Sequence, residues 1–325
     1  MCMNLSATLR SLDYSALPLS DYSRRYILGL LPALDYHLLI YRRTLDRLLD
    51  ALGREPQRLT LVDYGGGHGF FSLVAKERGV GRVVYVDINP QAAEAAQAVS
   101  RAIGQGPDVV ITGDAATLRR WSGDTGIVPD ALAGFDVVEH IYRLEPFFAD
   151  LFAIHPALPM MLTTGSNPSN PLVCRRLHRI MDEDEHGYPG FEGFLAQRRR
   201  YIQQLHPEMD DASLDRSARL TRGLTFDDIP AAIQNPKFKI QNSLDPHNTC
   251  DPATGSWTER LLPIDAYRNL LAPHGATLRV ASGFYNPFGT GAKPLAARLV
   301  NPLLPRLRCL APFITLEINL PRAKQ

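Results

Sequence analysis

The sequence predicts an α/β fold with a doubly wound, mostly parallel sheet of seven strands. Two observations predict it. Short apolar runs alternate with helical segments over residues 58–165, as in parallel sheets that helices cover on both faces. Two further strand-like runs, 276–286 and 311–321, follow a long polar stretch and would complete the sheet. We therefore expect an N-terminal helical extension and a helical and loop insertion between strands five and six.

The elements follow one another in a regular order. Residues 20–52 predict helices, because leucines recur near helical spacing, Pro32 suits a first turn and Gly53 suits a helix stop. The first five strands are expected at 58–64, 81–89, 107–115, 130–135 and 157–165, with helices at 70–79, 90–104 and 144–155.

The pattern divides the chain into three parts. Residues 1–55 form the N-terminal helical extension, and residues 56–165 together with 276–325 form the α/β core. Residues 166–275 break the strand–helix rhythm and are rich in Pro, Asn, His, Arg and aromatic residues. We expect this insertion to bind substrate and to act as a lid, with helices near 171–184, 191–205 and 211–222.

The composition argues against some classes of partner and of cellular location. Lys and Arg total 35 against 34 Asp and Glu, so the net charge of +1 gives no reason to expect nucleic acid as a partner. The four cysteines are far apart, as in reduced, cytoplasmic proteins. Charged residues or prolines interrupt the most apolar stretches, so no membrane span is expected.

The strongest motif is a glycine loop, Asp63-Tyr64-Gly65-Gly66-Gly67-His68-Gly69, between strand one and the next helix. Glycines let the backbone turn tightly and let a ligand approach it, and the helix N-terminus adds free N–H groups. Dinucleotide-binding dehydrogenases place a third glycine where this chain has Phe70, so the spacing disfavours NAD.

Two acidic residues follow the next strands. Asp87 closes strand two, where a carboxylate can accept hydrogen bonds from both hydroxyls of a ribose. Asp114 follows strand three and is placed to reach an adenine amino group.

With these acids, the D-x-G-x-G-x-G loop resembles that of class I S-adenosylmethionine (SAM) dependent methyltransferases, over residues 58–165 and 276–321. The resemblance implies SAM as the cofactor and methyl transfer as the activity. It also implies cofactor-binding roles for Asp63, Gly65, Gly67, Asp87, Ile88, Asp114, Ala115 and Phe135. Asp63 and the glycines would hold the methionine part, Asp87 the ribose, and Asp114 with Ala115 the adenine.

The segment Asp136–Ile141 lies beyond strand four, at the edge where open parallel sheets bind ligands. It resembles the E-x-x-E-H segment of ubiquinone-pathway O-methyltransferases and small-RNA 2′-O-methyltransferases, with Asp136 replacing the first Glu. In one interpretation Asp136, Glu139 and His140 bind Mg²⁺ or Mn²⁺. In the other, which we favour, Glu139 and His140 orient a metal-free loop and His140 is the general base.

The resemblance thus implies methyl transfer to a small-molecule acceptor, at a hydroxyl oxygen, by in-line displacement. Two alternatives stay open: a metal-assisted methyltransferase acting on an RNA end or a catechol-like diol, and a non-catalytic SAM-binding protein. The Pro-rich connection 293–311 between the last two strands is consistent with a homodimer surface or with a long loop.

Overall fold

A computed structural model describes residues 4–235 and 244–321 and contains one seven-stranded sheet in the order β3-β2-β1-β4-β5-β7-β6. β7 is antiparallel to both of its neighbours, and the other pairs are parallel. The strands are β1 Thr60–Tyr64, β2 Arg82–Asp87, β3 Val109–Thr112, β4 Ala131–Phe135, β5 Met160–Thr164, β6 Leu278–Ser282 and β7 Ile314–Ile318. The predicted doubly wound, mostly parallel sheet of seven strands is confirmed.

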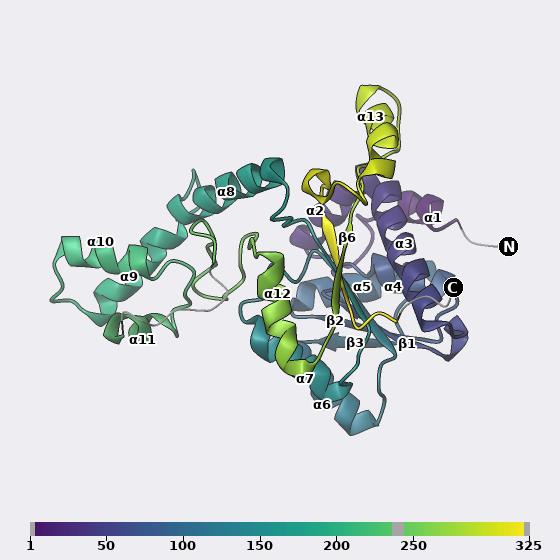
Figure 1. The fold of residues 1–325 in the computed structure, drawn as a ribbon, viewed down its shortest axis with the longest axis horizontal. Helices are drawn as coiled ribbons and strands as arrows, with labels where there is room; N and C mark the ends of the chain where they lie inside the picture. Colours follow the sequence, from purple (N-terminus) through teal and green to yellow (C-terminus); the bar gives the residue numbers. More distant parts are fainter. Residues whose placement is uncertain (1–3, 236–243, 322–325) are drawn as a thin grey trace.

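Helices cover both faces of the sheet (Figure 1). One face carries α3 Leu34–Leu52, α4 Phe70–Glu77 and α5 Pro90–Ile103, and the other carries α6 Ala115–Thr125, α7 Leu144–Ile154 and α12 Ile264–Leu271. Each face has its own apolar core, which explains why most strand residues are buried. The sequence did not indicate α6 or α12, since α6 is largely polar and α12 lies inside the irregular stretch 166–275.

The N-terminal helices are confirmed. α1 Leu5–Ser11 and α2 Asp21–Leu30 precede α3, and Pro32 lies in the short 3₁₀ turn that joins α2 to α3. α3 ends at Gly53, whose φ of 59° is the left-handed conformation that glycine adopts without strain. Leucines of α1 and α3 pack with α4 in the core beneath the sheet.

The insertion extends away from the sheet, on the left of Figure 1. Its helices are α8 Pro171–His186, α9 Phe194–Leu205, α10 Asp211–Leu220 and α11 Ile229–Gln234, which confirms the three predicted helices and adds α11. A fully buried ion pair between Arg198 and Glu185 joins α9 to α8 over 2.5 Å. Arg198 is therefore paired within the insertion and does not line the cavity at the sheet edge.

The remaining elements are short. α13 Ala292–Val300 stands between β6 and β7, in the segment where the sequence showed only a Pro-rich connection. The 3₁₀ turns are η1 Leu31–Ala33, η2 Pro56–Arg58, η3 Ala272–His274, η4 Asn301–Leu303 and η5 Arg308–Leu310. In the described ranges, no helix combines the length and the apolar character that crossing a bilayer requires.

Candidate functional site

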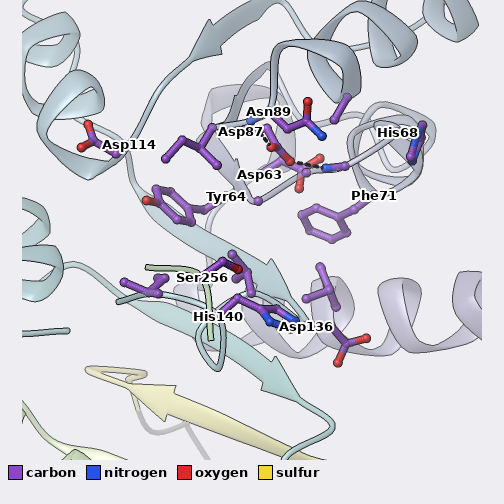
Figure 2. A pocket seen from close by; sticks show the side chains of 18 of the residues that line it. Asp63, Tyr64, His68, Phe71, Asp87, Asn89, Asp114, Asp136, His140 and Ser256 are labelled. Atoms are coloured by element: carbon purple, nitrogen blue, oxygen red, sulfur yellow. Dashed lines mark hydrogen bonds between the residues drawn. The ribbon is translucent and has the colours of Figure 1, made fainter. Parts of the chain in front are cut away.

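A cavity of about 550 Å³ opens at the carboxyl edge of the sheet. It lies where β1 neighbours β4, the point at which the strand order reverses and where such sheets bind ligands. Three regions line it: the glycine loop with the residues that follow β2 and β3, the N-terminal helices α2 and α3, and the loop after β4 with the turn 254–256 of the insertion. Figure 2 shows Asp63 and Asp87 on one side, with His140, Asp136 and Ser256 across from them.

The glycine loop contains two glycines with different tasks. Gly65 has a φ of 65°, and a Cβ built on it would overlap the side chain of Val137. Gly67 has a φ of 52° and donates its N–H to Asp87 over 2.9 Å, yet a Cβ built on it meets no atom within 4 Å. Gly65 is thus required by the packing of the protein itself, whereas Gly67 leaves space beside the cavity.

Asp63 lies at the bottom of the cavity and is buried. One of its carboxylate oxygens accepts hydrogen bonds from the backbone N–H of Ser72, over 3.1 Å, and from the Ser72 hydroxyl, over 2.6 Å. Burial raises the pKa of Asp63 to about 7, and these two bonds only partly oppose the shift. A positively charged ligand group at this place would therefore favour the ionised carboxylate.

Asp87 joins the glycine loop to the turn after β2. Its Oδ2 accepts the N–H of Gly67 over 2.9 Å, and its Oδ1 accepts the N–H of Asn89 over 2.8 Å. Burial raises the pKa of Asp87 above its ordinary value. Each oxygen can accept a second hydrogen bond, so both remain able to bind ribose hydroxyls. The next residue, Ile88, is 76% exposed at the rim of the cavity, where its side chain can cover a bound ring.

Of the two residues predicted to contact adenine, Asp114 lines the cavity and Ala115 does not. Asp114 lines the cavity and caps α6, with Oδ1 accepting both the N–H and the hydroxyl of Thr117 over 2.9 Å. Its other oxygen has no partner in the described residues and can accept from a ligand. Ala115, by contrast, is buried in the first turn of α6 and does not line the cavity. Helix α6 begins there and turns the side chain of Ala115 into the core, so its role at adenine stays a prediction.

Phe135 ends β4 and borders the cavity, as expected. Its ring lies 4.6 Å from that of Tyr41 and 4.7 Å from that of Phe71, measured between centroids. This aromatic cluster joins α3, α4 and β4 and forms an apolar wall next to the glycine loop.

His140 also lines the cavity, and its ring orientation is fixed. Nδ1 lies 2.7 Å from the carbonyl oxygen of Trp257. Because a carbonyl oxygen can only accept, Nδ1 carries the hydrogen, and Nε2 of the neutral ring keeps its lone pair. His140 therefore has the tautomer that a general base needs.

The predicted metal triad of Asp136, Glu139 and His140 is not assembled. Glu139 is buried, does not line the cavity and accepts the N–H of Gly165 over 3.2 Å, and Asp136 accepts the same N–H over 3.2 Å. Burial, reinforced by the charge of Asp136, holds the pKa of Glu139 well above its ordinary value. His140 contacts Trp257 through Nδ1, so only its Nε2 is left for another partner. Nowhere in the part of the chain that the structure describes do three such ligands converge.

Of the two residues predicted to be catalytic, His140 lines the cavity and Glu139 does not. Glu139 lies behind the loop and contributes through its backbone, whose carbonyl accepts the N–H of Arg260. Asp136 faces the cavity with a φ of 48°, an unusual conformation for a residue with a side chain. We read this strained backbone as the consequence of the tight turn that directs His140 toward the cavity.

The insertion clamps the loop after β4. The backbone N–H of Trp257 donates to the carbonyl of His140 over 3.2 Å, and its indole N–H donates to the carbonyl of Tyr142 over 3.1 Å. The Tyr142 hydroxyl in turn donates to Asp228 over 2.6 Å. The turn Thr254–Ser256 next to Trp257 lines the cavity. The insertion therefore both covers the cavity and holds His140.

Sequence reasoning missed the contribution of the N-terminal helices. Tyr22 and Tyr26 on α2, and His37 and Tyr41 on α3, line the cavity. The ring of Tyr26 stacks on that of His68 at 4.6 Å, and both ring nitrogens of His68 are buried without a hydrogen-bond partner among the described residues. Burial lowers the pKa of His68 to about 4. The signal was present as two pairs of ring-bearing residues spaced by four, which share one helix face.

Comparison with known proteins gives short or distant matches. No family model matches the chain. Over 38 residues it is 53% identical to the ribosomal protein L11 methyltransferase of Burkholderia mallei, a match that spans 12% of this chain and 13% of that protein.

Solved structures match over more of the chain. It is similar to SAM-dependent methyltransferases from Mesorhizobium loti (16% identity, 83% of this chain and 94% of that chain, TM-score 0.40) and Archaeoglobus fulgidus (11%, 85% and 93%, TM-score 0.39). The fold assignment rests on the strand order and on antiparallel β7.

Proposed function

We propose that this protein is a SAM-dependent methyltransferase that acts on a hydroxyl group of a small molecule. One observation carries the proposal. The free space at Gly67, beside the carboxylate of Asp87, lies in the same cavity as the open Nε2 of His140. A cofactor site and a general base thus share one cavity.

The charges of the cavity suit SAM, which carries a positive sulfonium and a positive ammonium group. Asp63, Asp87, Asp114 and Asp136 line it. Among the described lining residues Arg143 is the only Lys or Arg, and it forms an ion pair with Asp228 at 2.5 Å. Excess carboxylate attracts a cationic cofactor and disfavours the phosphates of NAD.

Different residues would contribute to different steps of methyl transfer. SAM supplies an activated methyl group. Nε2 of His140 accepts the proton that the acceptor hydroxyl loses as its oxygen bonds to the methyl carbon, and the electron pair of the broken bond stays on sulfur. Tyr26 and Tyr41 of the N-terminal helices and the turn Thr254–Ser256 enclose the cavity, which aligns the acceptor and excludes water. A cavity of about 550 Å³ suits the cofactor with a small acceptor.

Calorimetric titration tests the cofactor first. SAM and S-adenosylhomocysteine are expected to bind with a Kd in the micromolar range or tighter, roughly 8 kcal/mol. NAD is the control ligand. Binding of NAD with no binding of either SAM or S-adenosylhomocysteine would overturn the proposal.

His140→Ala tests the catalytic part. Formation of S-adenosylhomocysteine is measured with a panel of phenols, catechols and aliphatic alcohols, with and without a chelator. Loss of a positioned general base is expected to lower turnover by about 10²- to 10⁴-fold while the Kd for SAM is retained. His186→Ala, an exposed histidine on α8, is the matched control.

Three results would count against this mechanism. Full activity of His140→Ala would remove the base. Tight SAM binding by the wild-type protein, with no transfer to any acceptor, would favour a non-catalytic SAM-binding protein. Loss of turnover in the chelator would restore the metal-assisted alternative.

A further inference from the structure

The segment 283–313, which joins β6 to β7 and is named here the basic hairpin, has an unusual charge. The whole chain has a net charge of +1. The basic hairpin holds Lys293, Arg298, Arg306 and Arg308 and contains no Asp or Glu, because no acidic residue occurs between Asp265 and Glu317. None of these four basic side chains has a salt bridge to any residue in the described ranges, although salt bridges are frequent elsewhere in the structure.

The same segment exposes large apolar side chains. They are Tyr285, Phe288, Leu295, Leu299, Leu303, Leu307 and Leu310. Seven of the seventeen large apolar residues exposed in the described chain thus fall between Tyr285 and Leu310. Four of the leucines recur at intervals of four from α13 onward. The basic hairpin projects from the body of the protein, at the top of Figure 1.

The exposure has a structural cause. The basic hairpin is too thin to form a core, and the buried hydrophobic residues within it are Ala297, Leu304 and Ala311. Its shape is nevertheless held by hydrogen bonds. Asn301 bonds both the N–H and the C=O of Tyr285, over 2.7 and 2.9 Å, and Arg298 donates to the carbonyl of Pro287 over 2.9 Å. The leucines are therefore presented by a built element.

We propose that the basic hairpin docks on an anionic lipid surface. Basic residues interspersed with exposed leucines and aromatic residues are the combination by which interfacial helices bind membranes, with apolar groups entering the headgroup boundary and cations contacting lipid phosphates. α13 has nine residues and is far too short to cross a bilayer, so the hairpin lies on the surface.

Charge favours lipid over a second copy of the chain as the occupant. In a symmetric dimer built on this surface, the basic hairpin would face its own copy. Lys293 and Arg306, both exposed, would then approach like charges with no acidic group of the hairpin to neutralise them. Anionic headgroups supply the missing negative charge over the whole surface.

The place of the hairpin gives the docking a consequence for the cavity. β6 runs parallel to β5, since β7 is antiparallel to both, so the basic hairpin leaves the sheet at the carboxyl edge. Its base is tied to α3, where the hydroxyl of Tyr36 donates to the carbonyl of Phe284 over 2.5 Å, next to the cavity residue His37. Docking would bring the edge that carries the cavity close to the lipid surface.

Vesicle flotation tests the proposal with the full chain. Vesicles of phosphatidylcholine alone are compared with vesicles that contain equal parts of phosphatidylcholine and phosphatidylglycerol, at low and high salt. We expect binding to the anionic vesicles, loss of binding at high salt, and no binding to neutral ones. Lys293→Glu and Arg306→Glu should each lower the partition coefficient about fivefold or more, the effect of one basic residue near an anionic surface.

Matched variants separate the hairpin from general effects. Leu299→Glu, at a residue 69% exposed, should also abolish flotation, whereas Leu220→Glu on α10, at a residue 76% exposed, should not change it. The same holds for Arg219→Glu on α10 as the control for the charge reversals. The proposal does not depend on the methyltransferase activity.

Three outcomes would overturn it: no flotation of the wild-type protein, equal flotation with neutral vesicles, or equal loss in the α10 controls. Sedimentation measures the oligomeric state in parallel. A wild-type dimer that Leu299→Glu converts to a monomer, without any vesicle binding, would assign the surface to a second copy of the chain instead.

Discussion

The two walls of the cavity are built in different ways. The wall that the proposed cofactor would contact, named here the cofactor wall, is formed by the glycine loop and Asp87. Its hydrogen bonds join residues close in sequence, such as Ser72 to Asp63, nine residues apart, and Gly67 to Asp87, twenty apart. The opposite wall, named here the acceptor wall, contains His140, which is held by Trp257, 117 residues away. One wall is a local strand–loop–helix unit, and the other exists only when the insertion has docked on the sheet.

This difference has a consequence for stability and for function. The cofactor wall shares the cores of the main sheet, whose strands are buried on both faces. The acceptor wall depends on a few contacts between the loop after β4 and the insertion. Changes in the acceptor wall should therefore affect turnover before they affect SAM binding, and changes in the cofactor wall should do the opposite.

The largest expected effect is that of Trp257→Ala, which removes the buried ring that joins the insertion to Tyr142. Loss of a buried Trp is expected to cost about 3–5 kcal/mol in the free energy of unfolding, measured by urea denaturation. Turnover should be lost, because the loop that carries His140 is released, while the Kd for SAM changes by less than about threefold. Trp121→Ala, at a partly buried Trp on α6, is the control and should cost less. A large loss of SAM affinity in Trp257→Ala would contradict the independence of the two walls.

Gly65→Ala tests the cofactor wall from the other side. The change adds the cost of a left-handed backbone, about 1–2 kcal/mol, to a clash with Val137 of about 1–3 kcal/mol. SAM binding should be lost as the loop moves. Gly53→Ala is a closely matched control, since Gly53 has a similar φ of 59° and open space around its Cβ position. It should show the backbone cost alone and retain SAM affinity, and equal costs for the two variants would argue against the clash.

The same difference explains what the sequence could predict. The glycine loop, Asp87 and Asp114 were found from the sequence because each is fixed by the strand that it follows. All three line the cavity, and their roles in holding a cofactor stay predictions. The fold could be predicted for the same reason, because the alternation of strands and helices is visible in the local sequence and is typical of a helix-covered parallel sheet.

The acceptor wall could not be predicted in the same way. The tautomer of His140 depends on a carbonyl more than a hundred residues away, and the sequence gives no sign of that contact. Glu139 was expected near His140 in the site, but the turn after β4 directs the two side chains apart. For the same reason, Asp136, Glu139 and His140 do not converge as three metal ligands would. The aromatic residues of α2 and α3 had a visible spacing, but only the fold shows that this face meets the cavity.

The pH dependence of SAM affinity sharpens the comparison further. Burial raises the pKa of Asp63 to about 7, compared with an ordinary value near 4, so without ligand this carboxyl is protonated below about pH 7. Folding then takes up a proton between about pH 4 and 7, and Asp63 contributes less stability as the pH rises through that window. A cationic ligand favours the ionised form, so binding releases the proton.

SAM affinity should therefore rise with pH up to about pH 7, by at most about tenfold per pH unit, and then level off. Calorimetry in buffers of different ionisation enthalpy measures the proton released. Asp63→Asn has no proton to lose and should give a weaker but flatter profile, whereas Asp108→Asn, at a surface ion pair with Lys76, should leave the profile unchanged. A flat profile for the wild-type protein would contradict the raised pKa.

The smallest effects come from removing one hydroxyl on each wall. Ser72→Ala leaves Asp63 with only a backbone N–H, and Tyr142→Phe leaves Asp228 with Arg143 and Thr225. Each change should cost about 1 kcal/mol of stability, the usual contribution of a hydrogen bond. Their functional effects should separate. Since the Ser72 hydroxyl lowers the pKa of Asp63, its loss should move the pH profile of SAM binding upward and leave turnover at saturating SAM nearly unchanged.

Tyr142→Phe should lower turnover by several-fold through the loop that carries His140, with an unchanged Kd for SAM and an unchanged pH profile of binding. Steady-state kinetics beside calorimetry on the same two variants measures both quantities. If each variant altered affinity and turnover to the same extent, the two walls would act as one unit, and the distance in sequence between their hydrogen-bond partners would have no bearing on the reaction. If the effects separate, the insertion determines the position of the acceptor wall and the glycine loop determines cofactor affinity. Turnover and SAM affinity could then be changed independently.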